Sequence, residues 1–371
     1  MDNNSAKLLY RIALTKINGI GDVLARNLLE AIGDEEQIFK SNKKQLMSVP
    51  GISTVLASEI LHPEVLPKAE KELQFVEKNK IQIFFYKDQG YPARIKECVD
   101  APIILYYKGN TDLNNLKIIS IVGTRKSTRY GTDFCDNFLQ DISSVFPDAL
   151  IVSGLAYGID VAAHKSALKN SMPTVGVLAH GLDRIYPSSH RKTAVEMLEK
   201  GGLLTEFPSG TEPDKFNFVR RNRIVAGMAD AVIIVQSGSK GGSLITAELA
   251  NSYDKDVFAV PGRITDQESV GCNLLIEQNK AALLQSADSF IRFMRWDSPK
   301  KDNKVKQKEL FLDLTEEEQG VYDLLIEMGP LHINFLANQL GVPMSVLLST
   351  LLSMEMKGVL RAGVGNIYHL N

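Results

Sequence analysis

Hydrophobic residues divide the chain into regions that differ in periodicity. Residues 1–79 consist of short apolar stretches with helical spacing, such as LLYRIALTKI and VLARNLLEAI, separated by glycine turns. Residues 80–296 alternate short aliphatic runs with helix-length stretches, and residues 315–371 return to helical spacing before a β-type tail. Residues 297–314 carry charge and a proline without periodicity, which predicts a linker between two domains.

The middle region, residues 80–296, predicts a parallel β-sheet. Runs of β-branched and aliphatic residues end in glycine or proline: IQIFFYK, KIISIVG, ALIVSG, PTVGVLAHG, GGLLTEFP, DAVIIVQSG and DVFAVPG. They are continuous rather than alternating, which is typical of strands covered on both faces by crossover helices. We therefore expect an α/β fold with a doubly wound, Rossmann-type parallel sheet. Ligands of such sheets bind outside the carboxyl ends of the strands.

The helical region, residues 1–79, contains two similar glycine turns, INGIG at residues 17–21 and VPGIS at residues 49–53. A hydrophobic-x-Gly-hydrophobic-Gly hairpin between helices can aim backbone N–H groups at a phosphate, as in helix-hairpin-helix (SAM-like) modules. The second copy has Ser53 where the first has Gly21. A small bundle whose helices end at glycines explains the same pattern, so both interpretations stay open.

The C-terminal region, residues 315–371, predicts a winged helix. It opens with a capping box formed by Thr315 and Glu318, and two further helical stretches and the tail VLRAGVGNIYHL follow. Its basic residues are Lys357 and Arg361, and its acidic residues are Glu316, Glu317, Glu318, Asp323, Glu327 and Glu355. The third helix presents Ser, Met and Leu where a helix that reads a DNA groove needs Arg, Lys or Asn. We expect this domain to contact protein and not to read duplex DNA.

Composition constrains the chemistry without identifying it. The 42 basic and 44 acidic side chains give a net charge of -2, so any surface for nucleic acid must be a local patch. Cys98, Cys135 and Cys272 form no CxxC pair, which argues against a zinc site or a disulfide framework and indicates a reducing cytoplasm. The start lacks a signal-peptide pattern, and no apolar run is long enough to span a bilayer. We expect a soluble, cytoplasmic protein.

The segment KFNFVRRNRIVAG, residues 215–227, combines rings, guanidinium groups and an amide at the expected start of a helix. Bases can stack on rings, guanidinium groups bind phosphates through two hydrogen bonds, and amides at a helix start donate to anions. The side chains concerned are Phe216, Phe218, Arg220, Arg221, Asn222 and Arg223. A solvated basic helix face beside two core phenylalanines explains the segment alone equally well.

Three other strand-to-helix turns have the composition of phosphate-binding turns, and one of them, SGLAYGIDVAAHKSAL at residues 153–168, contains Gly154 and Gly158. IVGTRKSTRYG places Arg125, Lys126 and Arg129 near the N–H groups of a helix start, although it lacks both the GxGxxG and the GK[ST] motif. SGSKGGSLITAELA, residues 237–250, is rich in Gly and Ser, whose amides and hydroxyls can hold a second phosphate. These turns shift the interpretation of residues 215–227 toward nucleic-acid binding.

No arrangement of residues typical of catalysis is present in the sequence. Asp160 and His164 face the same side of a helix, but no third ligand lies close by, so we expect a structural Asp–His hydrogen bond. The loop HGLDRIYPSSH, residues 180–190, has neither a nucleophile elbow nor metal-ligand spacing. We expect no metal, no cofactor and no enzymatic activity.

In this order the motifs resemble the DNA-processing protein A family, also called DprA or Smf. The matching elements are IVGTR, SGLAYGIDVAAH, TVGVLAHGLDRIYP, TEFP, RRNRIVAG, GSLITAELA and VFAVPG. The helical front and the winged-helix tail also look like the full-length architecture of that family. After GCNLLIE the family usually continues with a glycine and an alanine. This chain instead has Gln278, Asn279, Lys280 and Ala281, which alters one loop.

The resemblance implies a non-catalytic protein that binds and protects incoming single-stranded DNA during natural transformation. It also implies that the protein loads the RecA recombinase onto that DNA and forms a homodimer through the Rossmann-type domain. The residues that match the family's DNA contacts are Gly123, Arg125, Arg221, Asn222 and Arg223, with Phe216 or Phe218 as the stacking ring and Ser243 as a further contact. We expect Arg125, Arg221 and Arg223 to converge at the carboxyl ends of the sheet.

The alternative is an enzyme with a related sheet. Rossmann-type phosphoribohydrolases that activate cytokinin nucleotides carry a PGGxGTxxE motif. In GGSLITAE, Thr246 and Glu248 are two residues apart instead of three, and Lys240 replaces the proline before the glycines. The altered spacing favours a binding protein over a hydrolase.

Overall fold

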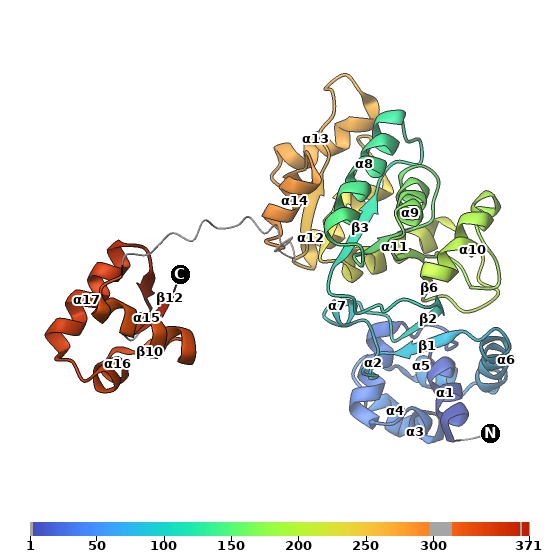
Figure 1. Cartoon of the computed structure of the whole chain (residues 1–371). Coiled ribbons are helices and arrows are strands. Elements are labelled where there is room, and N and C mark those ends of the chain that lie inside the picture. The colour runs from blue at the N-terminus through green and yellow to red at the C-terminus, as the bar shows by residue number, and fades with distance from the viewer. Residues whose placement is uncertain (1–2, 297–313, 364–365, 371) are drawn as a thin grey trace. The chain divides into compact units, whose positions relative to one another are not determined.

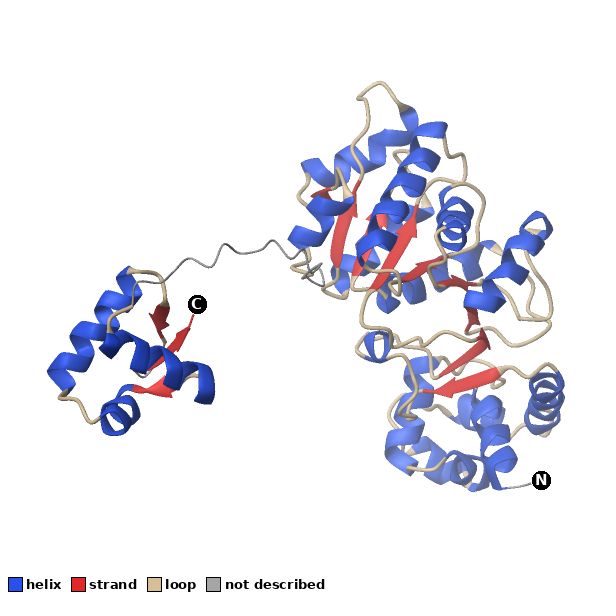
Figure 2. Ribbon diagram, in the orientation of Figure 1, coloured by secondary structure: helices blue, strands red, loops and turns tan. Residues whose placement is uncertain are grey.

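The protein is described by a computed structural model covering residues 3–296, 314–363 and 366–370 (Figures 1 and 2). The chain divides into two compact units, residues 1–299 and 300–371. The first unit contains the helical region and the sheet, and the second contains the C-terminal helices and a small sheet. The linker predicted over residues 297–314 lies, apart from Leu314, outside the described residues.

The first unit begins with a group of short helices: α1 (Asn3–Leu14), α2 (Asp22–Ile32), α3 (Glu35–Lys40), α4 (Lys43–Met47), α5 (Thr54–Ile60) and α6 (Val65–Lys78). Gly19 and Gly51 form the two predicted hairpins with positive φ angles of 76° and 89°. A Cβ at Gly19 would lie 2.9 Å from Leu56, and one at Gly51 would lie 2.7 Å from Leu24. The two hairpins therefore pack against each other as a tandem.

The sheet of the first unit contains β1 (Gln82–Phe85), β2 (Ile104–Gly109), β3 (Ile118–Val122), β4 (Leu150–Ser153), β5 (Thr174–Val177), β6 (Gly201–Thr205), β7 (Ala231–Ile234), β8 (Asp256–Ala259) and β9 (Ala282–Leu283). The strand order is β1-β2-β6-β5-β4-β3-β7-β8-β9, and β3 to β9 pair in parallel. This arrangement confirms the doubly wound, Rossmann-type sheet. Its order reverses between β3 and β7.

The edge formed by β1 and β2 differs from the prediction. β1, the IQIFFYK run, pairs antiparallel with β2, and β2 pairs antiparallel with β6. Strand β2, with the sequence ILYYKG, was not among the predicted strands. Phe85 and Tyr106 belong to the core of the helical domain. A strand buried by neighbouring elements has the same apolar run in either direction, so composition could not indicate the antiparallel pairing.

Helices cover both faces of the sheet: α7 (Ala93–Lys96), α8 (Arg129–Val145), α9 (Ile159–Lys169), α10 (Arg191–Lys200), α11 (Lys215–Met228), α12 (Gly242–Ser252), α13 (Val270–Glu277) and α14 (Ala287–Phe293). Alternate residues of β3 separate the two cores. Ile119 and Ile121 pack with α8, α9 and α14, whereas Ile118 and Val122 pack with α11, α12 and α13. α11 and α12 thus lie together beside the reversal point.

The second unit contains α15 (Glu316–Met328), β10 (Leu331–His332), α16 (Ile333–Leu340), α17 (Met344–Met356), β11 (Leu360–Ala362) and β12 (Ile367–Leu370). Its strand order, β10-β12-β11, and its own hydrophobic core agree with the predicted winged helix. The capping box between Thr315 and Glu318 is present. Among the described residues, no single helix is long and apolar enough to cross a membrane. The pair α16 and α17, bent by 113° at the break between them, has the length and composition of a span only when the two helices are taken together.

Candidate nucleic-acid interface

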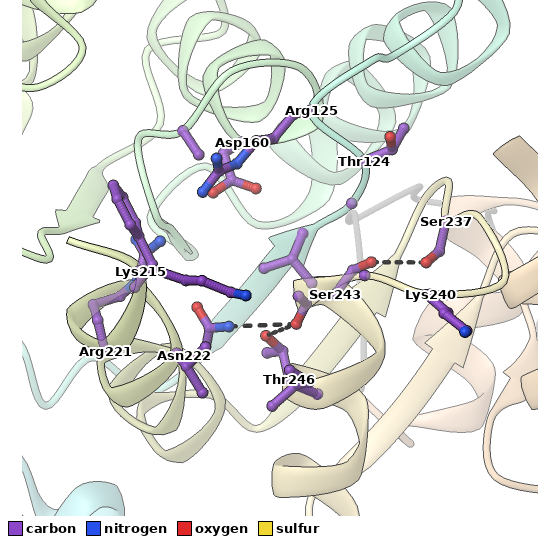
Figure 3. Close-up of a pocket in the computed structure, with 18 of the residues that line it drawn as sticks. Thr124, Arg125, Asp160, Lys215, Arg221, Asn222, Ser237, Lys240, Ser243 and Thr246 are labelled. Atoms are coloured by element: carbon purple, nitrogen blue, oxygen red, sulfur yellow. Dashed lines mark hydrogen bonds between the residues drawn. The ribbon is translucent and has the colours of Figure 1, made fainter. Parts of the chain in front are cut away.

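A pocket of about 780 Å³ opens at the carboxyl ends of β3 and β7, where the strand order reverses (Figure 3). Doubly wound sheets bind ligands at such switch points, because the loops after the two strands diverge there. The wall combines residues 122–126 at and after the end of β3, residues 237, 238 and 240–243 after β7, and the first turns of α11 and α12. The predicted phosphate turns and the segment 215–227 therefore meet at one site.

The turn after β3 approaches its neighbours closely because it begins with glycine. A Cβ at Gly123 would lie 2.9 Å from Gln236 O, which is too close for any side chain. The Thr124 N–H donates to the same oxygen at 2.7 Å and ties the turn to the segment after β7. Arg125 is exposed, with its guanidinium 5.0 Å from the ring centroid of Phe218. Gly123 thus contributes backbone to the pocket, and Arg125 contributes a cation.

The turn after β7 presents the start of α12 to the pocket. No side chain caps the first amides of this 11-residue helix. Ser243 lines the pocket, and its hydroxyl donates to Ser237 Oγ at 2.9 Å. Lys240 is exposed on the same turn, and Asn222 donates from α11 to Gly242 O at 3.3 Å (Figure 3). An uncapped helix start beside a lysine is suited to a phosphate.

α11 divides the predicted basic and aromatic segment between two faces. Residues three or four apart share one side of a helix, and Lys215, Phe218 and Asn222 line the pocket together. Phe216 is 83% exposed and is not part of the pocket wall. Its amide and the next one are occupied, because Asp214 accepts hydrogen bonds from both. The predicted anion site at the start of α11 is therefore already filled by a carboxylate.

Arg221 lies beneath the pocket surface. It is 4% exposed, and its Nη1 donates to Val177 O at 2.5 Å. Its guanidinium occupies the space that a side chain at Gly154 would need, and Asp160 accepts from Gly154 N at 3.2 Å. Burial lowers the pKa of Arg221 and raises the pKa of Asp160, while the charge of each partly offsets this effect in the other. Arg221 thus supports the pocket floor from below.

Arg223 contacts the helical domain instead of the pocket. Its Nη2 contacts Asp22 Oδ2 at 3.1 Å and also Glu206 Oε2, and its Nη1 donates to Asp100 O. Arg220 pairs with the carboxylates of Glu206 and Asp22 at 2.7 and 3.3 Å. The expected convergence of three arginines therefore does not include Arg223, because α11 directs residues 220 and 223 to its other side. Both arginines contact Asp22 at the start of α2, the helix that follows the first hairpin.

The groups considered for catalysis have structural partners. His164 is fully buried with its Nδ1 2.7 Å from Thr174 Oγ1, and burial lowers its pKa to about 3. The expected hydrogen bond between Asp160 and His164 is absent, because each side chain bonds to a different strand end. His180 bonds backbone groups of its own loop through both ring nitrogens. Within the described ranges, no cluster of His, Cys, Asp or Glu could hold a metal ion.

Two cations of the pocket were missed from the sequence, Lys215 and Lys240. Both are exposed and both belong to the pocket wall. Lys215, Phe218 and Asn222 are spaced by three and four residues, which places them on one face of a helix. This spacing is the sequence signal that could have identified Lys215. Lys240 falls within the predicted turn SGSKGG, but the prediction of a phosphate site there rested on the glycines and serines and did not include the lysine. The pocket mouth therefore carries more positive charge than predicted.

The fold and the pocket define a Rossmann-type protein with a cationic site at the switch point of its sheet. Along the chain, a helix-hairpin-helix domain precedes the sheet and a winged helix follows it. The family model described as DNA recombination-mediator protein A matches residues 82–295. Models of a SAM-like helix-hairpin-helix tandem and of the DprA winged helix domain match residues 12–61 and 311–366. The chain belongs to the DprA/Smf family.

Individual relatives agree with this assignment. DNA processing protein DprA of Bacillus subtilis is 35% identical over 263 residues, which cover 68% of this chain and 87% of that protein. The Streptococcus pneumoniae DprA structure is 32% identical with a TM-score of 0.67, covering 76% of this chain and 97% of that one. A Helicobacter pylori structure, whose title concerns the single-stranded DNA binding mode of DNA processing protein A, is 31% identical with a TM-score of 0.53. That match covers 58% of this chain and 96% of the other.

Proposed function

We propose that this protein binds single-stranded DNA in the pocket at the carboxyl ends of β3 and β7. The observation that carries the proposal is the exposed Arg125 guanidinium 5.0 Å from the ring of Phe218, beside Lys215 and the uncapped start of α12. Cations and helix-start amides hold successive phosphates, and a ring stacks on an unpaired base. Relatedness to the Helicobacter pylori protein supports the choice of a single strand.

The lining residues suggest a division of roles in this complex. Arg125, Lys215 and Lys240 contact phosphates, and Phe218 provides the stacking surface. Gly123, Asn222 and Ser243 shape the turns that approach the DNA backbone, and Arg221 adds positive charge from beneath the pocket floor. Duplex DNA binds more weakly, because its paired and stacked bases cannot reach a ring inside a pocket.

Family membership supports a wider role. The protein protects incoming single strands during natural transformation, loads RecA onto them and acts as a homodimer through the Rossmann-type domain. RecA loading is tested by following RecA filament formation on strands precoated with single-strand-binding protein. Filament formation that does not accelerate when this chain is added contradicts that role and leaves the DNA-binding proposal intact.

The proposal contains no catalytic step. The lining carboxylates are Asp160, which is buried, and Asp214, which caps α11, whereas Glu248 is not part of the pocket wall. Incubation with nucleoside monophosphates should therefore release no free base. Release that persists through purification and disappears in Glu248→Gln favours the phosphoribohydrolase alternative.

Removing two lining cations tests the site. In Arg125→Ala with Lys215→Ala, the slope of log affinity against log salt should become shallower by about 1.4, or about 0.7 for each lost phosphate contact. A matched control replaces Lys192 and Lys200 of α10, two exposed lysines that do not line the pocket. A fluorescent thymidine oligomer titrated at several salt concentrations gives both slopes. Parental affinity and slope in the pocket variant would show that the site lies elsewhere.

A further inference from the structure

The winged-helix unit contains a second pocket, which belongs to neither the sheet nor the DNA-binding proposal. Its volume is about 230 Å³, and it lies between the start of α15, the end of α16 and the first half of α17. The apolar lining consists of Val321, Leu340, Val342, Val346 and Leu347. Val346 is 40% exposed, so this apolar surface is open to solvent. An open apolar pocket of this size accommodates one large side chain.

A glycine helps to keep the pocket open. Gly320 lies within α15 and lines the cavity, and a Cβ at this position would lie 3.2 Å from Leu340 Cδ2. A larger residue would therefore narrow the space between α15 and α16. Glycine weakens a helix interior, and Gly320 does not have the positive φ that would otherwise require it. The glycine at this position leaves the cavity between α15 and α16 open.

The rim of the pocket is acidic. Glu316 and Glu317, both exposed, line it from the first turn of α15. In the part of the chain that the structure describes, neither carboxylate takes part in an ion pair, whereas Glu318 beside them is bound by Lys357 at 2.6 Å. The two rim carboxylates therefore attract a cationic partner and repel nucleic acid.

We propose that this pocket docks a basic segment of another protein. The segment inserts one large aliphatic or aromatic side chain between α15 and α17 and places Lys or Arg beside Glu316 and Glu317. An apolar anchor surrounded by a polar rim is the usual arrangement at the centre of a protein interface. A second copy of this domain is a poorer match, because its acidic residues outnumber its basic ones and two copies repel each other. The proposal stands independently of the DNA site.

Selection from a library of random peptides displayed on phage, with the full chain as target, tests the proposal. The enriched peptides should combine one large apolar residue with flanking Lys or Arg. Fluorescence anisotropy of a recovered peptide should show that Val346→Glu binds it at least about tenfold more weakly than the parental chain does. The double variant Glu316→Gln with Glu317→Gln should show a similar loss. Two control variants, Ile326→Glu and Glu327→Gln, change exposed residues of α15 outside the pocket and should bind the peptide as the parental chain does.

Several results would overturn the proposal. These are a selection that enriches no peptide, peptides without the basic and apolar combination, and equal binding to the parental chain and to Val346→Glu. Sedimentation that shows self-association lost in Val346→Glu would make a second copy the occupant and would also overturn it. If circular dichroism shows that Val346→Glu unfolds the domain, Thr350→Lys places a cation in the same pocket and gives the same comparison.

Discussion

At the residue scale, the contact between Phe218 and Arg125 is the central feature of the proposed DNA site. The Phe218 ring lies 5.0 Å from the guanidinium of Arg125 and 5.9 Å from the ring of Tyr186. A ring held between two neighbours loses little freedom when a base stacks on it, so more of the stacking energy contributes to affinity. Phe216 lies outside the pocket wall and is 83% exposed. The two phenylalanines should therefore behave differently.

Replacing Phe218 with alanine should weaken binding of a thymidine oligomer by about 1–3 kcal/mol, the usual effect of losing one stacked base. Phe216→Ala should change the binding free energy by less than about 0.5 kcal/mol, as for other surface substitutions. The salt slope should stay unchanged in both variants, because a ring releases no counterions. Anisotropy titrations at several salt concentrations measure both quantities. Equal losses in the two variants would contradict the assignment of the stacking ring to Phe218.

Arg223 should matter for stability more than for DNA. Arg223→Ala removes one partner of a buried ion pair with Glu206 and should destabilise the first unit by about 3 kcal/mol, the lower end of the usual range, because Arg220 still contacts Glu206. The salt slope for oligonucleotide binding should remain that of the parental chain. Denaturant unfolding and salt titration of this variant, beside Arg125→Ala, separate the two effects. A shallower slope with unchanged stability would place Arg223 on the DNA.

At the scale of helices and strands, hydrophobic patterning and turn composition predicted most of the architecture. The runs before Gly123 and Ser237 predicted β3 and β7, and the topology of doubly wound sheets predicted that their turns meet. Patterning could not show that β1 and β2 run antiparallel, since burial is alike in both directions. It also could not show which side of α11 points to the pocket, and this decides whether Phe216 or Phe218 lines the wall. That orientation is fixed by ion pairs of the helix with Glu206 and with Asp22, and Asp22 is far away in sequence.

In the winged helix, one carboxylate connects two helices. Glu318 is 3% exposed and contacts Lys357 and the Thr315 N–H. The hydrogen bond from Lys357, followed by that from Thr315, lowers the pKa of Glu318 to about 2, below its ordinary value. Since the folded state favours the charged form, this stabilisation is complete above the ordinary pKa of glutamate and is lost as the pH falls toward 2.

Glu318→Gln should therefore lower the unfolding free energy of the winged helix by about 1–2 kcal/mol at neutral pH, because the amide replaces a charged acceptor with a neutral one. The difference from the parental chain should shrink as the pH falls from about 4.5 toward 2, where Glu318 itself becomes protonated. Thermal unfolding followed by circular dichroism across this range measures the difference. Glu327→Gln, an exposed residue of the same helix, serves as the control and should have little effect. A difference that stays constant down to pH 2 would contradict the assigned pKa.

At the scale of the whole molecule, charge is distributed unevenly between the two units. The net charge is -2, yet the pocket wall of the first unit includes four exposed cations: Arg125, Lys126, Lys215 and Lys240. The winged helix, residues 315–371, has the opposite character, with Lys357 and Arg361 against six acidic residues. Attraction for phosphates is therefore concentrated in the first unit, and the acidic surface for a basic partner in the second.

This distribution predicts the behaviour of a chain that ends at Leu314. Its affinity for a thymidine oligomer should stay within about twofold of the full chain with the same salt slope, because no phosphate contact is removed. The second unit has its own hydrophobic core, so the first unit should keep its circular dichroism spectrum and its unfolding midpoint. The truncated chain should also lose binding to peptides recovered with the acidic pocket, while Arg125→Ala in the full chain should keep it. A large loss of oligonucleotide affinity in the folded truncated chain would show that the winged helix contributes to the DNA site, contrary to its charge and to the side chains of α17.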